Sequence, residues 1–119
     1  MNKLIAWVEV PVKDMEKAVT FYNKVFGLSL EILDFGHEKM ALFPNDEGAL
    51  SLAKGFNPSA EGLLASLNVP DTMEATMARI NKHGGNVLVP KTKIEAEGRG
   101  YFATFKDCEG NTIGLYSNK

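Results

Sequence analysis

Residues 10–16 read Val10-Pro11-Val12-Lys13-Asp14-Met15-Glu16, and a similar stretch over residues 69–74, Val69-Pro70-Asp71-Thr72-Met73-Glu74, returns about half a chain later. Each copy follows an apolar run typical of a strand and leads into a segment with apolar residues at helical spacing. Pro11 to Pro70 spans 59 positions and Met15 to Met73 spans 58, so the second copy is one residue shorter. A duplicated unit predicts two similar half-structures packed face to face, and such interfaces favour ligand sites.

The first half of the chain predicts the element order β-α-β-β-β. Apolar residues with a break at Pro11 predict a strand over 4–10, and Asp14 is a good N-cap for a helix that ends at Gly27. Turn-forming residues then separate three short strands, which we expect at 28–33, 38–43 and 49–53.

The second half predicts the same order. Asp71 is the expected N-cap of its helix, and Glu74 completes a capping-box pattern. The other expected elements are a strand over 63–69, a short strand over 86–89 that Pro90 ends, a loop over 91–99, and a hairpin of strands 101–105 and 112–117. The sequence thus predicts one α+β domain over 1–119, with half-units at about 1–56 and 61–119 and both helices outside curved sheets.

Composition excludes several classes of protein. The chain has 119 residues, 45% of them hydrophobic, and a net charge of −2, which provides no basic field for nucleic acid. No apolar run approaches the ~20 residues of a membrane span. The single cysteine excludes an internal disulfide, and Glu9 interrupts the stretch in which a signal peptide would stay apolar. We therefore expect a cytoplasmic protein with neither a nucleic-acid nor a membrane partner.

Several stretches together resemble the vicinal oxygen chelate superfamily, which includes glyoxalase I, bleomycin-resistance proteins and extradiol dioxygenases. They are Val10–Ala18, Phe21-Tyr22, Phe26-Gly27 and Asp107–Leu115, the last with Cys108 where the family usually has proline. Further stretches resemble a branch of small bacterial proteins related to lactoylglutathione lyase, namely Gly55–Ser59, Leu67–Val69, Gly84-Gly85 and Pro90–Thr92. The resemblance implies a glyoxalase-like domain and a homodimer in which four half-units build two clefts.

The same resemblance implies where a metal ion would bind. Metal-dependent members place one His or Glu on each of four strands, and the matching positions here are Trp7, Ser51, Leu64 and Gly114. None of these four is a competent ligand for a divalent ion. The two histidines, His37 and His83, are expected in a turn and at a helix end. We therefore expect no metal and no other cofactor.

Strand alternation predicts which side chains line the cleft. If Trp7 points inward, so does Glu9, whose carboxylate could be a base, could bind a cation, or could make a structural hydrogen bond to Asn68 or a nearby turn. Trp7 could fill the volume of the absent metal site or stack on a flat ligand. The remaining expected ligand-binding residues are Ser51, Leu64, Ser66, Asn68, Gly114 and Tyr116.

Three functions remain open from the sequence. The first is a metal-free protein that binds a small molecule in a cleft at the dimer interface. The second is a lyase or isomerase of the superfamily with Glu9 as its base. The third is a dimeric module whose cleft is filled by its own side chains. The sequence does not identify the ligand, and it does not decide whether a reaction is catalysed.

Overall fold

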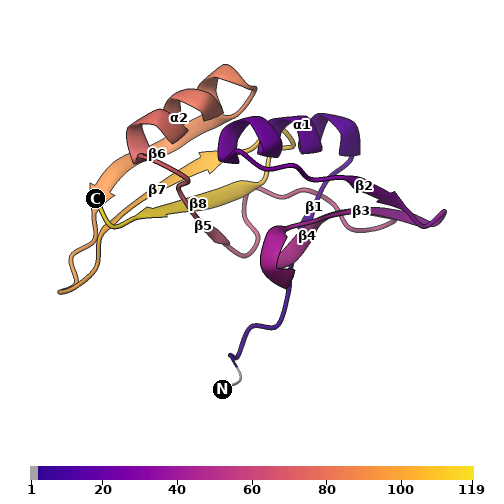
Figure 1. Ribbon diagram of the computed structural model, residues 1–119, viewed down its shortest axis with the longest axis horizontal. Coiled ribbons are helices and arrows are strands. Elements are labelled where there is room, and N and C mark those ends of the chain that lie inside the picture. The colour runs from indigo at the N-terminus through magenta and orange to yellow at the C-terminus, as the bar shows by residue number, and fades with distance from the viewer. Residues whose placement is uncertain (1–2) are drawn as a thin grey trace.

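The computed structural model describes residues 3–119, which form two four-stranded sheets with both helices over the same side (Figure 1). The first half contains β1 (Val8–Pro11), α1 (Met15–Phe26), β2 (Ile32–Asp34), β3 (Glu38–Leu42), the 3₁₀ turn η1 (Pro44–Asp46) and β4 (Gly48–Ala53). The second half contains β5 (Ser66–Asn68), α2 (Met73–Lys82), β6 (Asn86–Lys93), β7 (Tyr101–Lys106) and β8 (Thr112–Ser117). The predicted α+β fold of two β-α-β-β-β half-units is confirmed. Residues 1 and 2 of the half-unit expected over 1–56 lie outside the described residues.

The two sheets have the same topology. Their strand orders are β1-β4-β3-β2 and β5-β8-β7-β6, and the first and last strands of each half pair in parallel. The N–H of Val12 donates to the carbonyl oxygen of Ser51 at 2.9 Å, and the N–H of Val69 donates to that of Tyr116 at 3.1 Å. These two bonds hold the same place in the two ladders. Val12 of the first half therefore corresponds to Val69 of the second, and Ser51 corresponds to Tyr116.

Helix α1 begins and ends where the sequence predicts. The carboxylate of Asp14 accepts the N–H of Lys17 at 3.1 Å, and Gly27 adopts the left-handed conformation with φ of 66°. The helix buries Phe21, Tyr22 and Phe26. Their rings and that of Phe105 in β7 form a cluster with centroids 5.2 to 6.3 Å apart. The core is therefore continuous between α1 of the first half and the sheet of the second.

Helix α2 is capped differently from the prediction. Its N-cap is Thr72, whose hydroxyl accepts the N–H of Ala75 at 3.1 Å. The expected cap, Asp71, instead accepts two hydrogen bonds from the guanidinium of Arg79 at 2.8 and 2.9 Å. The carboxylate of Glu74 pairs with Lys91 at 3.0 Å. The capping-box prediction was wrong, because Arg79 binds the carboxylate of Asp71 and Lys91 binds that of Glu74. Within residues 3–119, neither helix is long and apolar enough to cross a membrane.

The first strand of each half begins later than predicted, at Val8 rather than Leu4 and at Ser66 rather than Leu63. β4 begins at Gly48, the partner of Val8, so the residues before Val8 have no strand to pair with. In the second half, the loop before β5 hydrogen-bonds to the start of β8. In the first half, the start of the neighbouring strand, which sequence periodicity does not show, therefore limits where β1 begins.

β6 extends through Pro90 to Lys93, so the prediction of a strand end at Pro90 followed directly by a loop was wrong. β6 is the edge strand of its sheet, and its pairing with β7 shifts register between Val87 and Val89 and again between Val89 and Thr92. Proline lacks an N–H and is tolerated at edges and bulges. The bulged edge therefore accommodates Pro90 without breaking the strand.

Candidate ligand-binding site

The strands next to the seam between the half-units present alternate side chains to opposite faces of their sheets. Val10 and Leu50 are buried under the helices. Their neighbours Glu9, Ala49 and Ser51 consequently lie on the face that no helix covers. Residues 3–7, which precede β1, extend on that same side, away from α1 and α2 (Figure 1).

The carboxylate of Glu9 is held by Ser51. The hydroxyl of Ser51 donates to Oε1 of Glu9 at 2.7 Å, and Ser51 is only 1% exposed whereas Glu9 is exposed. We expected a structural partner of Glu9 at Asn68 or in a nearby turn. The partner instead lies on β4, because the parallel register places Ser51 beside Pro11, two residues beyond Glu9. One side of the carboxylate is thus fixed and the other faces solvent.

Glu9 lines a hollow of about 530 Å³ at the seam between the two half-units. Its walls are mostly apolar and come from the residues before β1, the loop between β4 and β5, and the start of β8. The principal wall residues are Ile5, Trp7, Phe56, Leu63, Leu64 and Thr112. Among the described residues that line it, Glu9 is the only charged one.

The other expected site residues lie elsewhere around the seam. Ser66 and Asn68 line a second cavity of about 510 Å³ on the helix side, with Tyr22 and Phe26 among its walls. Gly114 and Tyr116 line neither cavity. The structure therefore brings Trp7, Glu9 and Leu64 together, connects Ser51 to them through Glu9, and leaves the remaining four outside the hollow.

The Tyr116 hydroxyl is occupied within its own half. It accepts the N–H of Gly100 at 3.1 Å and donates to Oδ1 of Asn118 at 3.0 Å. These bonds hold the end of β8 against the loop that precedes β7.

Two wall residues, Phe56 and Leu63, were missed by the sequence analysis. Both lie in the connection between β4 and β5, and residues 55–59 read only as a separator between strands. The side chain of Leu63 is completely exposed, although the residue lines the hollow. For Phe56, the available signal was a large apolar side chain in a stretch otherwise made of Gly, Asn, Pro and Ser.

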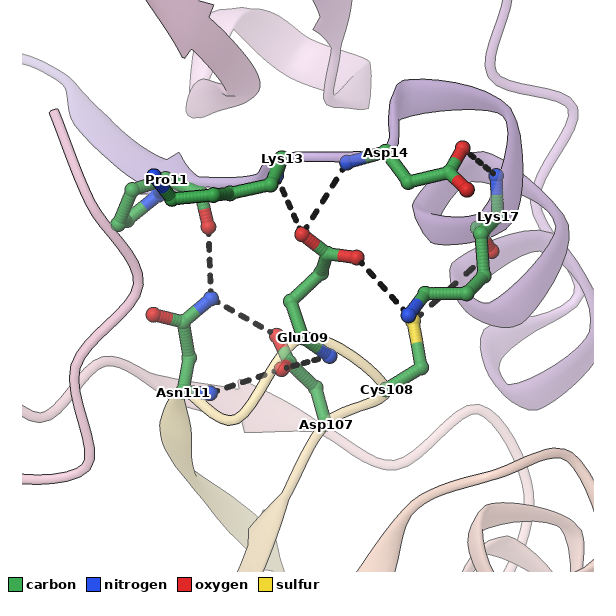
Figure 2. Close-up of polar contacts among 8 residues, drawn as sticks. All are labelled: Pro11, Lys13, Asp14, Lys17, Asp107, Cys108, Glu109 and Asn111. Atoms are coloured by element: carbon green, nitrogen blue, oxygen red, sulfur yellow. Dashed lines mark hydrogen bonds and ion pairs between the residues drawn. The ribbon is translucent and has the colours of Figure 1, made fainter.

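A polar cluster in the turn between β7 and β8 joins the two halves (Figure 2). The buried carboxylate of Asp107 accepts the hydroxyl of Tyr22 at 2.7 Å and the N–H groups of Glu109 and Asn111 at 2.9 Å each. The amide of Asn111 donates to the carbonyl oxygen of Pro11 at 2.8 Å. Burial first, and then the charge of Asp107, raises the pKa of Tyr22 well above its usual value.

Glu109 binds the start of α1 from the same turn. Its carboxylate accepts the N–H groups of Lys13 and Asp14, and it pairs with the ammonium of Lys17 at 3.3 Å (Figure 2). A carboxylate at a helix N-terminus satisfies free N–H groups and complements the helix dipole. The motif that carried much of the resemblance therefore holds the half-units together.

Cys108 in this turn is half-buried. Burial, together with the negative charges of Asp107 and Glu109, raises the pKa of its thiol to about 12. At neutral pH the side chain is therefore a thiol, which is a poor nucleophile.

Comparison with known proteins identifies the family. A sequence profile of the Glyoxalase/Bleomycin resistance protein/Dioxygenase superfamily matches residues 4–115. The chain belongs to this superfamily. A "Glyoxylase-like domain-containing protein" of Didymella fabae is 31% identical over 121 residues, covering 93% of this superfamily member and 91% of the fungal protein.

Solved structures share the fold of this superfamily member. A glyoxylase/bleomycin resistance protein/dioxygenase domain from Frankia sp. EAN1pec superposes with a TM-score of 0.73 at 14% identity, over 100% of both chains. Glyoxalase I from Zea mays superposes with a TM-score of 0.68 at 22% identity. The match covers 95% of this chain but 45% of the maize chain, so this protein spans less than half the length of that enzyme.

The superfamily's metal chemistry does not fit the residues of this member. Trp7 and Leu64 have no donor atom for a divalent ion, Gly114 has no side chain, and the hydroxyl of Ser51 is bound to Glu9. The Glu9–Ala49 and Ser66–Gly114 pairs hold the same place in the two ladders, so Ala49 is the counterpart of Gly114 in the first half. The side chain of alanine also has no donor atom for a metal ion.

The remaining candidate ligands are dispersed. Within residues 3–119, no three His, Cys, Asp or Glu side chains form a group that could hold a metal ion. The side chain of His37 is 81% exposed and lies next to Glu38, and His83 is the C-cap of α2. Moreover, the hydroxyl of Ser66 lies 2.5 Å from where a Cβ at position 114 would be, so a glutamate there would require Ser66 to move.

Proposed function

We propose that this superfamily member is a metal-free protein that binds a small molecule in the hollow beside Glu9, and that a second copy of the chain completes the cleft. The observation that carries the proposal is the hollow itself. Trp7 and Leu64, which stand at two metal-ligand positions, form its walls together with Glu9. Its volume of about 530 Å³ falls within the roughly 300–1,000 Å³ of small-molecule sites.

A large exposed surface supports the second copy. The chain exposes 7509 Å², whereas a folded monomer of 13.0 kDa is expected to expose roughly 6,300 Å². The excess of about 1,200 Å² exceeds the roughly 800 Å² that each partner buries in a standard interface. Apolar residues at or next to the rim of the hollow contribute to this surface, notably Leu4, Ile5 and Leu63.

Sedimentation tests the assembly. We expect a species of twice the 13.0 kDa chain mass at micromolar concentration. Leu63→Asp should shift this species toward the monomer, because a charge would replace an apolar contact. Leu88→Asp, at an exposed leucine on β6 that does not line the hollow, is the control. A wild-type monomer at all concentrations would reject the second copy.

A ligand screen with metal analysis tests the binding function. Protein treated with a chelator is screened against small metabolites by thermal shift, and we expect hits whose effect is unchanged when Ni, Zn or Mn is added. Leu64→Arg should abolish the hits by filling the hollow, whereas Leu88→Arg should retain them. About one metal ion per chain, lost on chelation together with ligand binding, would reject the proposal.

A lyase or isomerase reaction with Glu9 as base is the second candidate. The observation that favours it is an exposed carboxylate that Ser51 orients within a largely apolar hollow. A base in this position would remove a proton from a bound substrate. If a screen hit is converted to product, Glu9→Gln should abolish turnover while the ligand still binds.

A further inference from the structure

We propose that the hollow selects a ligand with a protonated amine on an apolar, preferably aromatic, body. The inference rests on the proposed binding function and names the chemical class of its ligand. Its basis is the pairing of one unneutralised carboxylate with apolar and aromatic walls.

Some carboxylates of the chain are neutralised by a neighbouring cation, and Glu9 is among those that are not. Asp71 pairs with Arg79, Glu74 with Lys91, and Glu109 with Lys17. Within residues 3–119, Glu9 has no ion-pair partner, and no Lys, Arg or His lines the hollow. The carboxylate therefore makes the electrostatic potential inside the hollow negative, which disfavours carboxylate or phosphate ligands.

The hydrogen bond from Ser51 leaves most of the carboxylate available. A carboxylate has about four acceptor positions, and Ser51 occupies one position on Oε1. The bond also orients the group, because Ser51 is itself buried in β4. An ammonium, which has only donors, matches the remaining acceptors.

Trp7 provides the second contact that an amine requires. It stands two residues before Glu9, and both side chains line the hollow. The face of an indole ring attracts organic cations. Phe56 and Leu64 complete an apolar wall for the rest of the ligand. A divalent metal ion would find only one carboxylate here, which is too few ligands to hold it.

The test compares three probes with one aromatic body and different charge: phenethylamine, phenethyl alcohol and hydrocinnamate. Trp7 is the only tryptophan, so its fluorescence reports directly on the hollow of the intact protein. We expect the amine to bind about tenfold more tightly than the alcohol, since an exposed ion pair and a cation–π contact both contribute, and the carboxylate more weakly still. Raised salt should narrow this difference.

Two variants assign the preference to Glu9. Glu9→Gln should weaken amine binding by up to about fivefold and leave alcohol binding within about twofold, because the ion pair is lost while the cation–π contact of Trp7 remains. Glu38→Gln removes a carboxylate from the same uncovered face, outside the hollow, and should leave both affinities unchanged.

Equal binding of amine and alcohol, or an amine preference that Glu9→Gln leaves undiminished, would overturn the charge selection while leaving the small-molecule site intact. Absence of binding by all three probes up to their solubility would overturn the inference, and the proposed function would fall with it only if the wider ligand screen also gives no hit.

Discussion

Replacing Tyr22 by phenylalanine tests whether the cluster at the β7–β8 turn holds the half-units together. The hydroxyl of Tyr22 is fully buried and donates to Asp107 at 2.7 Å, and Asp107 is 3% exposed. A hydrogen bond to a buried charged group contributes about 1.5–3 kcal/mol. Because Asp107 keeps its bonds to Glu109 and Asn111, we expect Tyr22→Phe to cost about 2 kcal/mol of unfolding free energy.

Urea unfolding at one fixed protein concentration measures this cost, since association with a second copy would make stability depend on concentration. With a slope of about 2 kcal/mol per molar urea, the midpoint should fall by about 1 M. Tyr116→Phe is the matched control, because the Tyr116 hydroxyl is less buried and its partners can bond to water. Its expected cost is below about 1 kcal/mol.

Alkaline pH provides a second measurement of the same hydrogen bond. Burial and Asp107 raise the pKa of Tyr22 in the folded state, so above the unfolded-state pKa of about 10 the folded chain binds one proton more than the unfolded chain. The stability that Tyr22 contributes is therefore complete below pH ~10 and declines by about 1.4 kcal/mol per pH unit above it. Tyr22→Phe should lack this decline. Equal costs for Tyr22→Phe and Tyr116→Phe, with identical alkaline profiles for wild type and Tyr22→Phe, would refute the reasoning.

Three further predictions follow from other contacts. Gly85→Ala would place a Cβ 2.8 Å from the carbonyl oxygen of Lys106 and should cost about 1–3 kcal/mol in urea unfolding, whereas Gly62→Ala, with no atom closer than 3.8 Å, should change stability by less than about 0.5 kcal/mol. The hydrogen bond from Arg79 lowers the pKa of Asp71 from 3.8 to about 2. The difference in stability between wild type and Asp71→Asn should therefore be present above pH ~4 and vanish as pH falls through ~2. A stability difference independent of pH would contradict the pairing. The thiol of Cys108, with its pKa raised to about 12, should react with a disulfide reagent at pH 7 far more slowly in folded than in urea-unfolded protein, and equal rates would show that the turn is open.

The sequence predicted α1 and the overall topology well because the signals involved are local. Asp14 caps a helix whose first N–H groups lie within three residues of it, and Gly27 ends that helix through its own backbone conformation. The repeat of this unit then implied two similar half-units. The placement of Trp7 and Glu9 in one hollow followed from strand alternation, which also depends only on neighbouring residues.

Tertiary structure decided the features that depend on partners distant in the chain. The sequence predicted Asp71 as the N-cap of α2. In the structure Arg79 binds the carboxylate of Asp71, and Thr72 is the cap. Glu9 found its hydrogen-bond donor in Ser51, 42 residues away, through a parallel register that periodicity does not specify. Strand periodicity indicates the face on which a side chain lies, whereas packing between the half-units determines which faces and loops meet to form the hollow beside Glu9.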